Sequence, residues 1–216
     1  MKTRIGFSLI TIFLTISACY LPNFGTDEDE QPTSSVLFQD DFSDPLSGWD
    51  RIEEAEGVTD YYDGKYRIYV GATNTDVWAN PGLEFTDSFI EVEAAKAGGD
   101  NNNDFGVICR YQDGENFYFF VISSDGYYGI GKLSGGTQML IGTQSMPPSE
   151  VIVQGEGANY IRAGCLGSTL TLIVNGETLA EYEDTEFTSG DVGLLAGSFT
   201  NPGTEIYFDN FQVLRP

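Results

Sequence analysis

The sequence predicts an all-β domain made of two packed antiparallel sheets, and three observations lead to this fold class. Short apolar and aromatic runs follow one another from Val36 to the end of the chain. Pairs that favour tight hairpin turns separate several of these runs, as at Asp63-Gly64, Asp113-Gly114, Asp125-Gly126 and Asn175-Gly176. No apolar repeat of helical period is long enough to predict a helix. About thirteen short strands, between about 12 and 14, favour a sandwich or jelly roll.

Alternation of side chains between these turns places the strands. The expected strands are Leu37–Phe42, Tyr66–Val70, Val77–Trp78, Phe89–Ala95, Phe105–Tyr111, Phe117–Ile122, Tyr127–Leu133, Met139–Ile141, Tyr160–Cys165, Thr169–Val174, Leu179–Tyr182, Val192–Ala196 and Glu205–Leu214. In the fifth of these, strict alternation puts Val107, Cys109 and Tyr111 on one face, and Ile108 and Arg110 on the other.

The N-terminus has the layout of a secretory signal peptide. A short basic start precedes an uncharged, mostly apolar run from Ile5 to Ile16, which is too short to span a bilayer as a helix. The next residues, up to Cys19, resemble a bacterial lipobox, in which the cysteine is lipidated and becomes the mature N-terminus. The sequence therefore predicts a lipoprotein signal peptide over residues 1–18 and a lipid anchor on Cys19, at the outer, extracytoplasmic face of the cell membrane. The alternative is an ordinary signal peptide cleaved nearby.

Between the leader and the strands lies a polar, acidic segment that contains proline. Residues 19–35 have no apolar period, so we expect a lipidated cysteine followed by a disordered tether. The folded domain is then expected to span residues 36–216.

Charge and histidine content exclude several classes of function. All 33 Asp and Glu follow Cys19, against 8 Lys and Arg there, so the mature chain carries a net charge of −25. This balance argues against nucleic acid as a partner and against electrostatic adhesion to anionic lipid. The chain has no His, which excludes His-ligated zinc and nucleophiles activated by His.

The cysteine count predicts one disulfide. If Cys19 is lipidated, Cys109 and Cys165 remain, and an exported protein works where disulfides persist. We therefore predict a bridge between these two residues, with a pair of buried free thiols as the alternative.

Four stretches carry a family resemblance: DDFSDPLSGWD at the domain start, FGVICRYQDGENFYFFVISSDGYYGIGKL in the middle, and IRAGCLGSTLTLIVNGETLAEYEDTEFTSGDVGLLAG and then EIYFDNFQVLRP at the end. Together they resemble the concanavalin A-like lectin and glucanase superfamily, and more narrowly the laminin-G-like and 3-keto-disaccharide hydrolase-like domains of exported bacterial lipoproteins. The resemblance implies a jelly roll whose first and last strands lie side by side, Phe38–Phe42 against Tyr207–Val213. Such domains include lectins, hydrolases and interaction modules.

The resemblance also implies that one sheet is concave and forms a ligand surface. The candidate residues for binding a glycan or a related ligand are aromatic or cationic: Trp78, Arg110, Tyr118, Tyr128 and Lys132. Aromatic rings stack on the apolar faces of sugars, and charged groups bond their hydroxyls. The alternative is that the aromatic side chains fill the core and that the two cations pair with surface carboxylates.

A structural calcium ion is a second candidate. Asp40, Asp41 and Asp44 would meet Asp209 and Asn210 if the terminal strands pair. Oxygen ligands of this kind suit calcium, with Asp41 and Asp209 as the leading ligands, whereas turn capping explains the same side chains equally well.

The sequence assigns no catalytic residue. Glu91 and Glu93 faintly resemble the acid-bearing strand of family 16 glycanases, but the third acidic position is Ala95. The leading hypothesis is therefore a lipid-anchored domain that binds glycans without catalysis. A glycoside-processing hydrolase of the same fold and a structural or protein-interaction module of the envelope are the alternatives.

Overall fold

The computed structural model describes residues 35–216, which contain fifteen strands and no helix. The predicted signal peptide, Cys19 and the tether up to residue 34 lie outside the described residues. Within the described part of the chain, no helix is long and apolar enough to cross a membrane.

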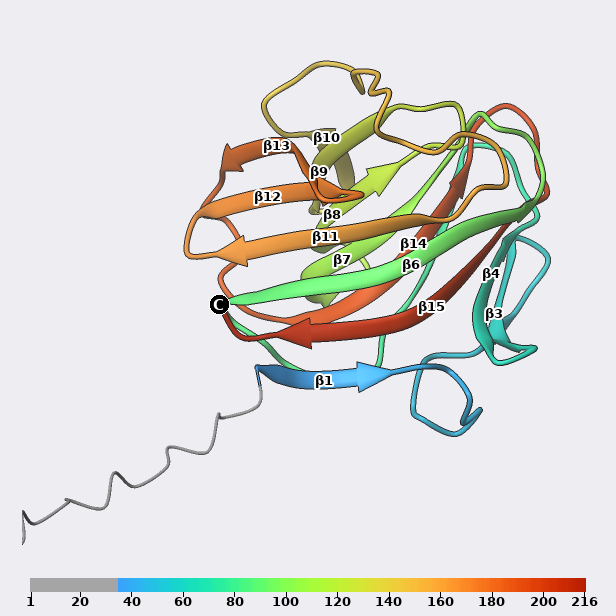
Figure 1. Cartoon of the computed structure of the whole chain (residues 1–216), viewed down its shortest axis with the longest axis horizontal. Coiled ribbons are helices and arrows are strands. Elements are labelled where there is room, and N and C mark those ends of the chain that lie inside the picture. The colour runs from blue at the N-terminus through green and yellow to red at the C-terminus, as the bar shows by residue number, and fades with distance from the viewer. Residues whose placement is uncertain (1–34) are drawn as a thin grey trace, which may run out of the picture. The chain divides into compact units, whose positions relative to one another are not determined.

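The larger sheet has nine strands and lies in front in Figure 1. Its strands are β1 (Val36–Asp40), β2 (Ile52–Glu53), β3 (Gly57–Tyr62), β4 (Lys65–Val70), β6 (Ser88–Gly98), β11 (Asn159–Leu166), β12 (Thr169–Val174), β13 (Glu177–Glu183) and β15 (Thr204–Leu214). They are ordered β13-β12-β11-β6-β15-β4-β3-β2, and β1 pairs with the second half of β15. All pairings are antiparallel.

The smaller sheet lies behind the first in Figure 1. Its strands are β5 (Thr75–Ala79), β7 (Asn103–Asp113), β8 (Asn116–Ile122), β9 (Tyr128–Ser134), β10 (Thr137–Leu140) and β14 (Asp191–Ser198). Their order is β10-β9-β8-β7-β14-β5, so β10 and β5 are the two edges.

The main hydrophobic core lies between the two sheets. Strand β12 illustrates the alternation, because Leu170, Leu172 and Val174 are fully buried while the residues between them are half-buried. The predicted disulfide between Cys109 on β7 and Cys165 on β11 is confirmed, and it ties one sheet to the other across this core.

The structure confirms the all-β, two-sheet jelly roll and the neighbouring terminal strands, in which Phe38 pairs with Val213. The structure has two strands that the sequence patterns did not predict, β2 and β3. Their segment is rich in Glu and Asp and lacks a clear apolar alternation. The pairing of β3 with β4 and of β2 with β3, rather than local pattern, therefore defines these strands. The turns at Asp63-Gly64 and Asn175-Gly176 have positive φ at both residues, as tight hairpins require.

Candidate functional site

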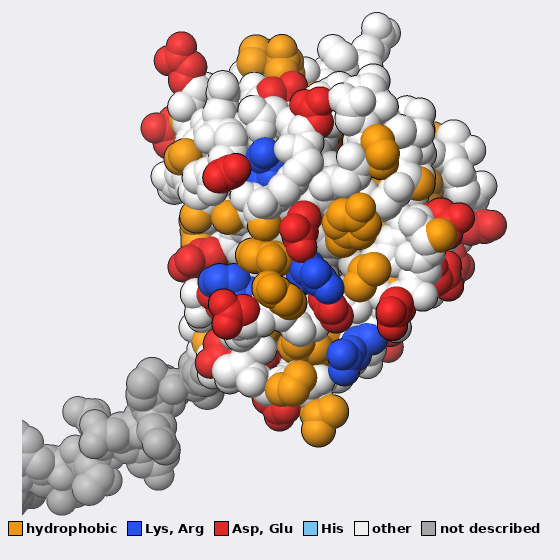
Figure 2. Space-filling model, turned by 90° about the vertical axis from the view of Figure 1, so that its right-hand side faces the viewer, with side chains coloured by type: hydrophobic (Ala, Val, Ile, Leu, Met, Phe, Trp, Pro, Cys, Tyr) orange, Lys and Arg blue, Asp and Glu red, His pale blue; other side chains and the backbone are white. Residues whose placement is uncertain are grey.

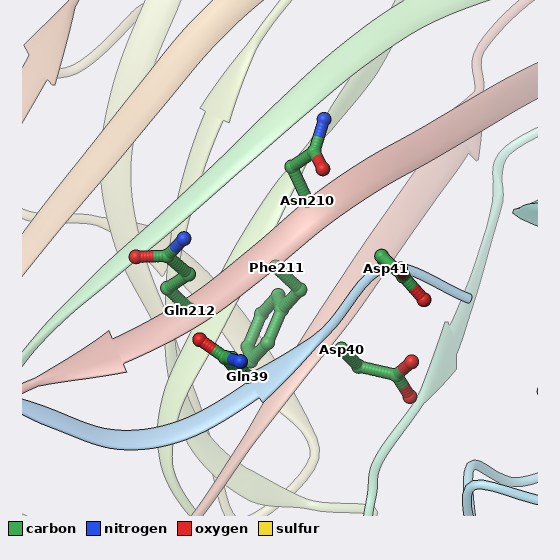
Figure 3. A pocket seen from close by; sticks show the side chains of 6 residues that line it. All are labelled: Gln39, Asp40, Asp41, Asn210, Phe211 and Gln212. Atoms are coloured by element: carbon green, nitrogen blue, oxygen red, sulfur yellow. The ribbon is translucent and has the colours of Figure 1, made fainter. Parts of the chain in front are cut away.

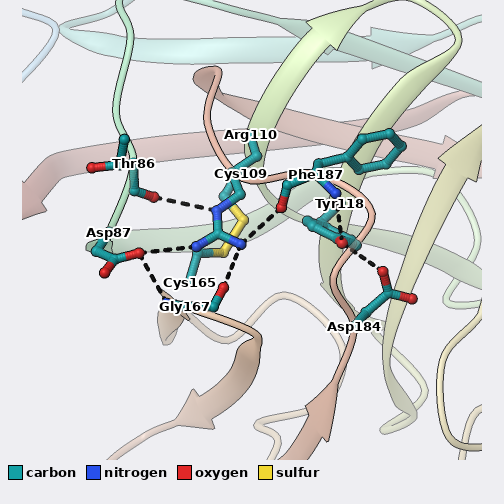
Figure 4. Close-up of a disulfide and its surroundings, with 9 residues drawn as sticks. All are labelled: Thr86, Asp87, Cys109, Arg110, Tyr118, Cys165, Gly167, Asp184 and Phe187. Atoms are coloured by element: carbon teal, nitrogen blue, oxygen red, sulfur yellow. Dashed lines mark hydrogen bonds and ion pairs between the residues drawn. A yellow bond between two sulfur atoms is a disulfide. The ribbon is translucent and has the colours of Figure 1, made fainter.

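Arg110 was expected to face a groove, but the structure buries it at the edge of the core (Figure 4). Its backbone has a φ of 52° within a bulge of β7. The guanidinium donates to the backbone oxygens of Gly167 and Phe187, at 2.8 and 2.9 Å, and pairs with Asp87 at 3.1 Å. Arg110 therefore ties three loops together and has no donor directed at an open surface.

Tyr118 and Lys132 meet at a shared carboxylate rather than at a sugar platform. The Tyr118 hydroxyl donates to Asp184 at 2.6 Å and accepts the backbone N–H of Phe187 at 3.0 Å. Lys132 pairs with both Asp184 and Glu186. Burial opposes the ionised form of Asp184, but hydrogen bonds from Lys132 and Tyr118 outweigh it and lower the pKa of this carboxyl. The alternative interpretation of these two residues, core packing and ion pairing, describes their positions.

The remaining two candidates lie on opposite faces of the smaller sheet. Tyr128 packs against the main core. Trp78 lies on the outer face, where its ring is 5.4 Å from that of Phe117. The structure therefore does not bring the five predicted ligand residues together in one groove.

Of the predicted calcium ligands, Asp40, Asp41 and Asn210 line a hollow of about 310 Å³ at the β1–β15 pair (Figure 3). Both aspartates already accept hydrogen bonds. Asp40 caps the N–H of Phe42 at 2.8 Å and accepts Trp49 Nε1 at 3.0 Å, while Asp41 accepts the N–H of Ser43 at 3.0 Å. Figure 3 shows the Asp40 carboxylate and the Asn210 amide pointing away from one another.

Asp209, the second leading calcium ligand, pairs with Lys65 instead. Across residues 35–216 no group of three or more His, Cys, Asp or Glu is placed to hold a metal ion. In this structure Asp40 and Asp41 cap turns and Asp209 forms an ion pair.

The outer face of the smaller sheet is strongly concave. Gln138 on β10 donates a 3.1 Å hydrogen bond to Asp76 on β5, although these strands are the opposite edges of the sheet. A flat sheet of six strands would hold its edges about 24 Å apart. The sheet therefore curls until its edges meet over its outer face.

Most of this concave face is filled by the protein's own side chains. A second apolar cluster covers it, with Trp78, Tyr111, Leu133, Leu140 and Met146 packed against the buried residues Ile108, Phe117, Phe119, Val121 and Leu195. A wide, flat platform for a sugar ring is therefore absent from the centre of this face.

Two carboxylates face each other at one end of the concave face. Asp76 on β5 and Asp104 on β7 both lie level with Gly197 on β14, the strand between them. A Cβ on Gly197 would stand 2.1 Å from Asp104 Oδ1 and 2.2 Å from Asp76 Oδ1. Only a glycine therefore lets the two carboxylates approach so closely.

Asp104 is the polar group of this site that has no partner in the protein. The residue is 3% exposed, and its Oδ1 is buried without a hydrogen bond. Burial raises the pKa of Asp104 well above its ordinary value, and the charge of Asp76 raises it further. Burial likewise raises the pKa of Asp76, which the hydrogen bond from Gln138 partly offsets.

A hollow of about 540 Å³ opens beside Asp104, and we call it the Asp104 hollow. Its lining combines acidic, amide, hydroxyl and apolar side chains: Asp104, Phe119, Val121, Gln138, Met139, Leu140, Thr143, Gln144, Met146 and Phe199. The hollow thus offers acceptors, amide donors and ring surfaces within one small space, which suits a polar ligand with apolar patches.

Another side of the molecule also carries aromatic and charged side chains, but these contact one another. Figure 2 shows hydrophobic groups among acids and bases on the side where β3 and β4 lie. Arg67 pairs with Asp60 at 2.7 Å and with Glu205 at 3.4 Å, and lies 4.9 Å from the ring of Tyr62. Tyr62 in turn stacks on Tyr207. These groups are already satisfied, so the Asp104 hollow is the stronger candidate.

Sequence patterns did not identify Asp76 or Asp104. Asp104 ends the polar run DNNND, which resembles a turn, and Asp76 follows two threonines and an asparagine. Alternation does place Asp104 on the face of Gly106 and Ile108. Their closeness depends on the register of three strands that are far apart in sequence, and a single sequence does not reveal that register.

Comparisons with known proteins place the fold. No family model and no curated protein matches the sequence. Among solved structures, the carbohydrate-binding module CBM66 from Bacillus subtilis is similar with a TM-score of 0.63 and 14% identity, over 78% of this chain and 96% of the module. The domain shares the two-sheet fold of this module. This jelly roll is also similar to a Bacillus subtilis protein of unknown function with a galectin-like fold, with a TM-score of 0.61 and 10% identity, over 85% of this chain and 98% of that one.

Larger enzymes contain a part that resembles this jelly roll. The GH43 protein BlXynB from Bacillus licheniformis is similar with a TM-score of 0.59 and 15% identity, over 82% of this chain but only 39% of the enzyme. At these identities the likeness concerns the fold alone.

Proposed function

We propose that the jelly roll binds a carbohydrate in the Asp104 hollow. The observation that carries this proposal is Asp104, which lines the hollow and whose buried Oδ1 has no hydrogen-bond partner in the protein. A buried acceptor without a partner costs about 1–3 kcal/mol, so a ligand that donates a hydrogen bond there gains this energy on binding. Sugar hydroxyls are donors of this kind.

The rest of the lining supports a sugar rather than a purely apolar ligand. Gln138 and Gln144 provide amide groups, and Thr143 provides a hydroxyl. Phe119 and Phe199 add ring surface against which the C–H groups of a sugar pack. The similarity in fold to a carbohydrate-binding module agrees with this choice of ligand.

We further propose that a lipid on Cys19 displays this domain at the outer face of the cell membrane. The signal-peptide layout and the lipobox-like residues before Cys19 support this location. Mass spectrometry of the mature N-terminus checks it, and Cys19→Ala is expected to move the protein from the membrane fraction to the soluble fraction. An unmodified N-terminus other than Cys19 would contradict the anchor.

A glycan array followed by calorimetry tests carbohydrate binding. Asp104→Ala and Gln138→Ala are each expected to weaken binding about tenfold or more, because each removes a polar group of the hollow. Asp63→Asn is the matched control, since Asp63 is an exposed turn residue with a φ of 51° that Asn adopts readily. The proposal fails if no glycan binds, or if neither hollow variant weakens binding while both remain folded.

Hydrolysis is a second candidate function, and the carboxylate pair is the observation that favours it. A carboxyl whose pKa is raised beside a second carboxylate is a candidate general acid. Incubation of any bound glycan with the protein, followed by analysis for new reducing ends, decides between the two. Products that Asp104→Asn abolishes would indicate catalysis, and an intact glycan would indicate binding alone.

A further inference from the structure

We infer that the negative charge of the Asp76–Asp104 pair makes the Asp104 hollow selective for neutral sugars, and excludes uronic acids and other anionic glycans. This inference rests on the proposed carbohydrate binding and adds the class of ligand. It depends on where the two carboxylates point and on which charges surround them.

The two acceptor atoms lie side by side. Asp76 Oδ1 and Asp104 Oδ1 both lie close to the point above Gly197 where a Cβ would stand. Gln138 holds the other oxygen of Asp76, Oδ2, at 3.1 Å, and so directs Oδ1 toward Asp104. Asp104 itself lines the hollow, and Asp76 is bonded to Gln138, which also lines it, so the negative charge of the pair lies at the wall of the hollow. A neutral hydroxyl can donate to a carboxylate there, and such charge-assisted bonds are the stronger kind.

No positive charge compensates this pair among the described residues that line the hollow. Lys132, Arg110 and Arg162 each pair with a carboxylate elsewhere. Lys65 and Arg67 likewise pair with acids on the larger sheet. An anionic sugar would therefore meet carboxylates without a counter-charge.

Protonation does not remove this selectivity. The raised pKa of Asp104 favours one proton on the pair, and the second carboxylate then still carries a negative charge. The protonated partner would also donate a hydrogen bond to a sugar oxygen. Whether the pair carries one proton or none, it can hydrogen-bond neutral hydroxyls and it repels a carboxylate, because like charges at an interface are strongly unfavourable.

The experiment compares matched oligosaccharides that differ only in oxidation at C6, neutral hexose against uronic acid, with the full chain by calorimetry. The neutral form is expected to bind about tenfold or more tightly than the uronic form. The double variant Asp76→Asn/Asp104→Asn keeps the shape of the side chains but removes both charges. It is expected to reduce this ratio to about threefold or less, whereas Asp63→Asn leaves the ratio unchanged.

Deoxy analogues of the bound neutral sugar test the donated hydrogen bond. Loss of the hydroxyl that donates to the carboxylate is expected to weaken binding about tenfold. If neither the neutral nor the uronic form binds, the proposed function itself fails. If both bind equally, or if the double variant keeps the original ratio, carbohydrate binding stands and the selectivity is overturned. Tighter binding of the uronic form that a chelator abolishes would also overturn it, because the pair would then hold a cation.

Discussion

Arg110 and Asp87 form an ion pair in which the two partners have very different surroundings. The Arg110 side chain is 2% exposed and the Asp87 side chain is 51% exposed, with 3.1 Å between Nη2 and Oδ1. The carboxylate also accepts the backbone N–H of Gly167 at 2.9 Å, so both residues hold the same loop (Figure 4). The other donors of Arg110 go to backbone oxygens, and its role is therefore to hold loops in place.

Arg110→Met is accordingly expected to destabilise the fold by about 3 kcal/mol, because the backbone oxygens of Gly167 and Phe187 lose their donor. Urea denaturation measures the loss. Arg51→Met, at an exposed position, is the control and should change the free energy of unfolding by less than about 0.5 kcal/mol. Equal stability of the two variants would contradict the structural role.

The disulfide is expected to contribute strongly to stability. Cys109 and Cys165 are 56 residues apart and join the two sheets, so the bond restricts the unfolded chain over a long loop. On the chain-entropy account, Cys109→Ala/Cys165→Ala should lower the free energy of unfolding by about 4 kcal/mol. Cys19→Ala, which lies outside the described domain, should leave that value unchanged. A double variant as stable as the parent would show that the bond contributes nothing.

Tyr118→Phe should destabilise the domain by about 1–3 kcal/mol without weakening glycan binding. The variant leaves the buried N–H of Phe187 without its acceptor and removes one donor from Asp184. Burial and the bond to Asp184 also raise the pKa of Tyr118 to about 12, so its hydroxyl stays protonated at neutral pH. Thermal melting measures the effect, with the exposed Tyr127→Phe as the control. Weaker binding in folded Tyr118→Phe would instead place this residue in the ligand site.

The faces of the strands could be predicted from the sequence until a bulge interrupted the alternation. Phe117, Phe119 and Val121 do lie opposite Tyr118 and Phe120, as alternation requires. In β7 the same rule fails after Cys109.

The bulge at Arg110 accounts for that failure. Arg110, with its positive φ, is the extra residue of the bulge. Tyr111 therefore lies on the outer face with Ile108, and the Arg110 side chain points toward the neighbouring loops. A bulge of this kind depends on backbone contacts with distant strands, including Gly190, whose missing side chain leaves room for the backbone at Arg110 and Tyr111. Local pattern therefore predicted the fold, but it did not predict where the Arg110 side chain lies.

The candidate site was missed for a related reason. Asp104 follows the alternation of β7 like its neighbours. It is a candidate site residue because Asp76 lies on the other side of Gly197, and because the curl of the sheet brings Gln138 to Asp76. These are contacts between strands separated by long stretches of sequence. Composition pointed instead to scarce cations, Arg110 and Lys132, whose carboxylate partners the sequence could not identify.

The buried Asp104 carboxyl should make the free energy of unfolding depend on pH. Burial, and then the charge of Asp76, raise the pKa of Asp104 in the folded state above its ordinary value of 3.8. The folded protein therefore holds this proton more tightly than the unfolded chain does. The stability that depends on it is present below that ordinary value and is lost as the pH rises through the folded-state pKa. Asp104→Asn stays neutral throughout and escapes this loss.

Urea denaturation at about pH 4, 6 and 8 measures the difference between Asp104→Asn and the parent. The free energy of unfolding of Asp104→Asn, relative to that of the parent, should rise with pH. The rise is about 1.4 kcal/mol for each pH unit between the pKa of Asp104 in the unfolded chain and its pKa in the folded protein. Asp76→Asn removes the charge beside Asp104 and also the burial penalty of Asp76 itself. It should therefore reduce the loss of stability with rising pH without abolishing it, because burial of Asp104 is the larger cause of its raised pKa. A difference that stays flat from about pH 4 to 8 would mean that Asp104 is not a buried carboxyl, and the hollow would then lose its defining group.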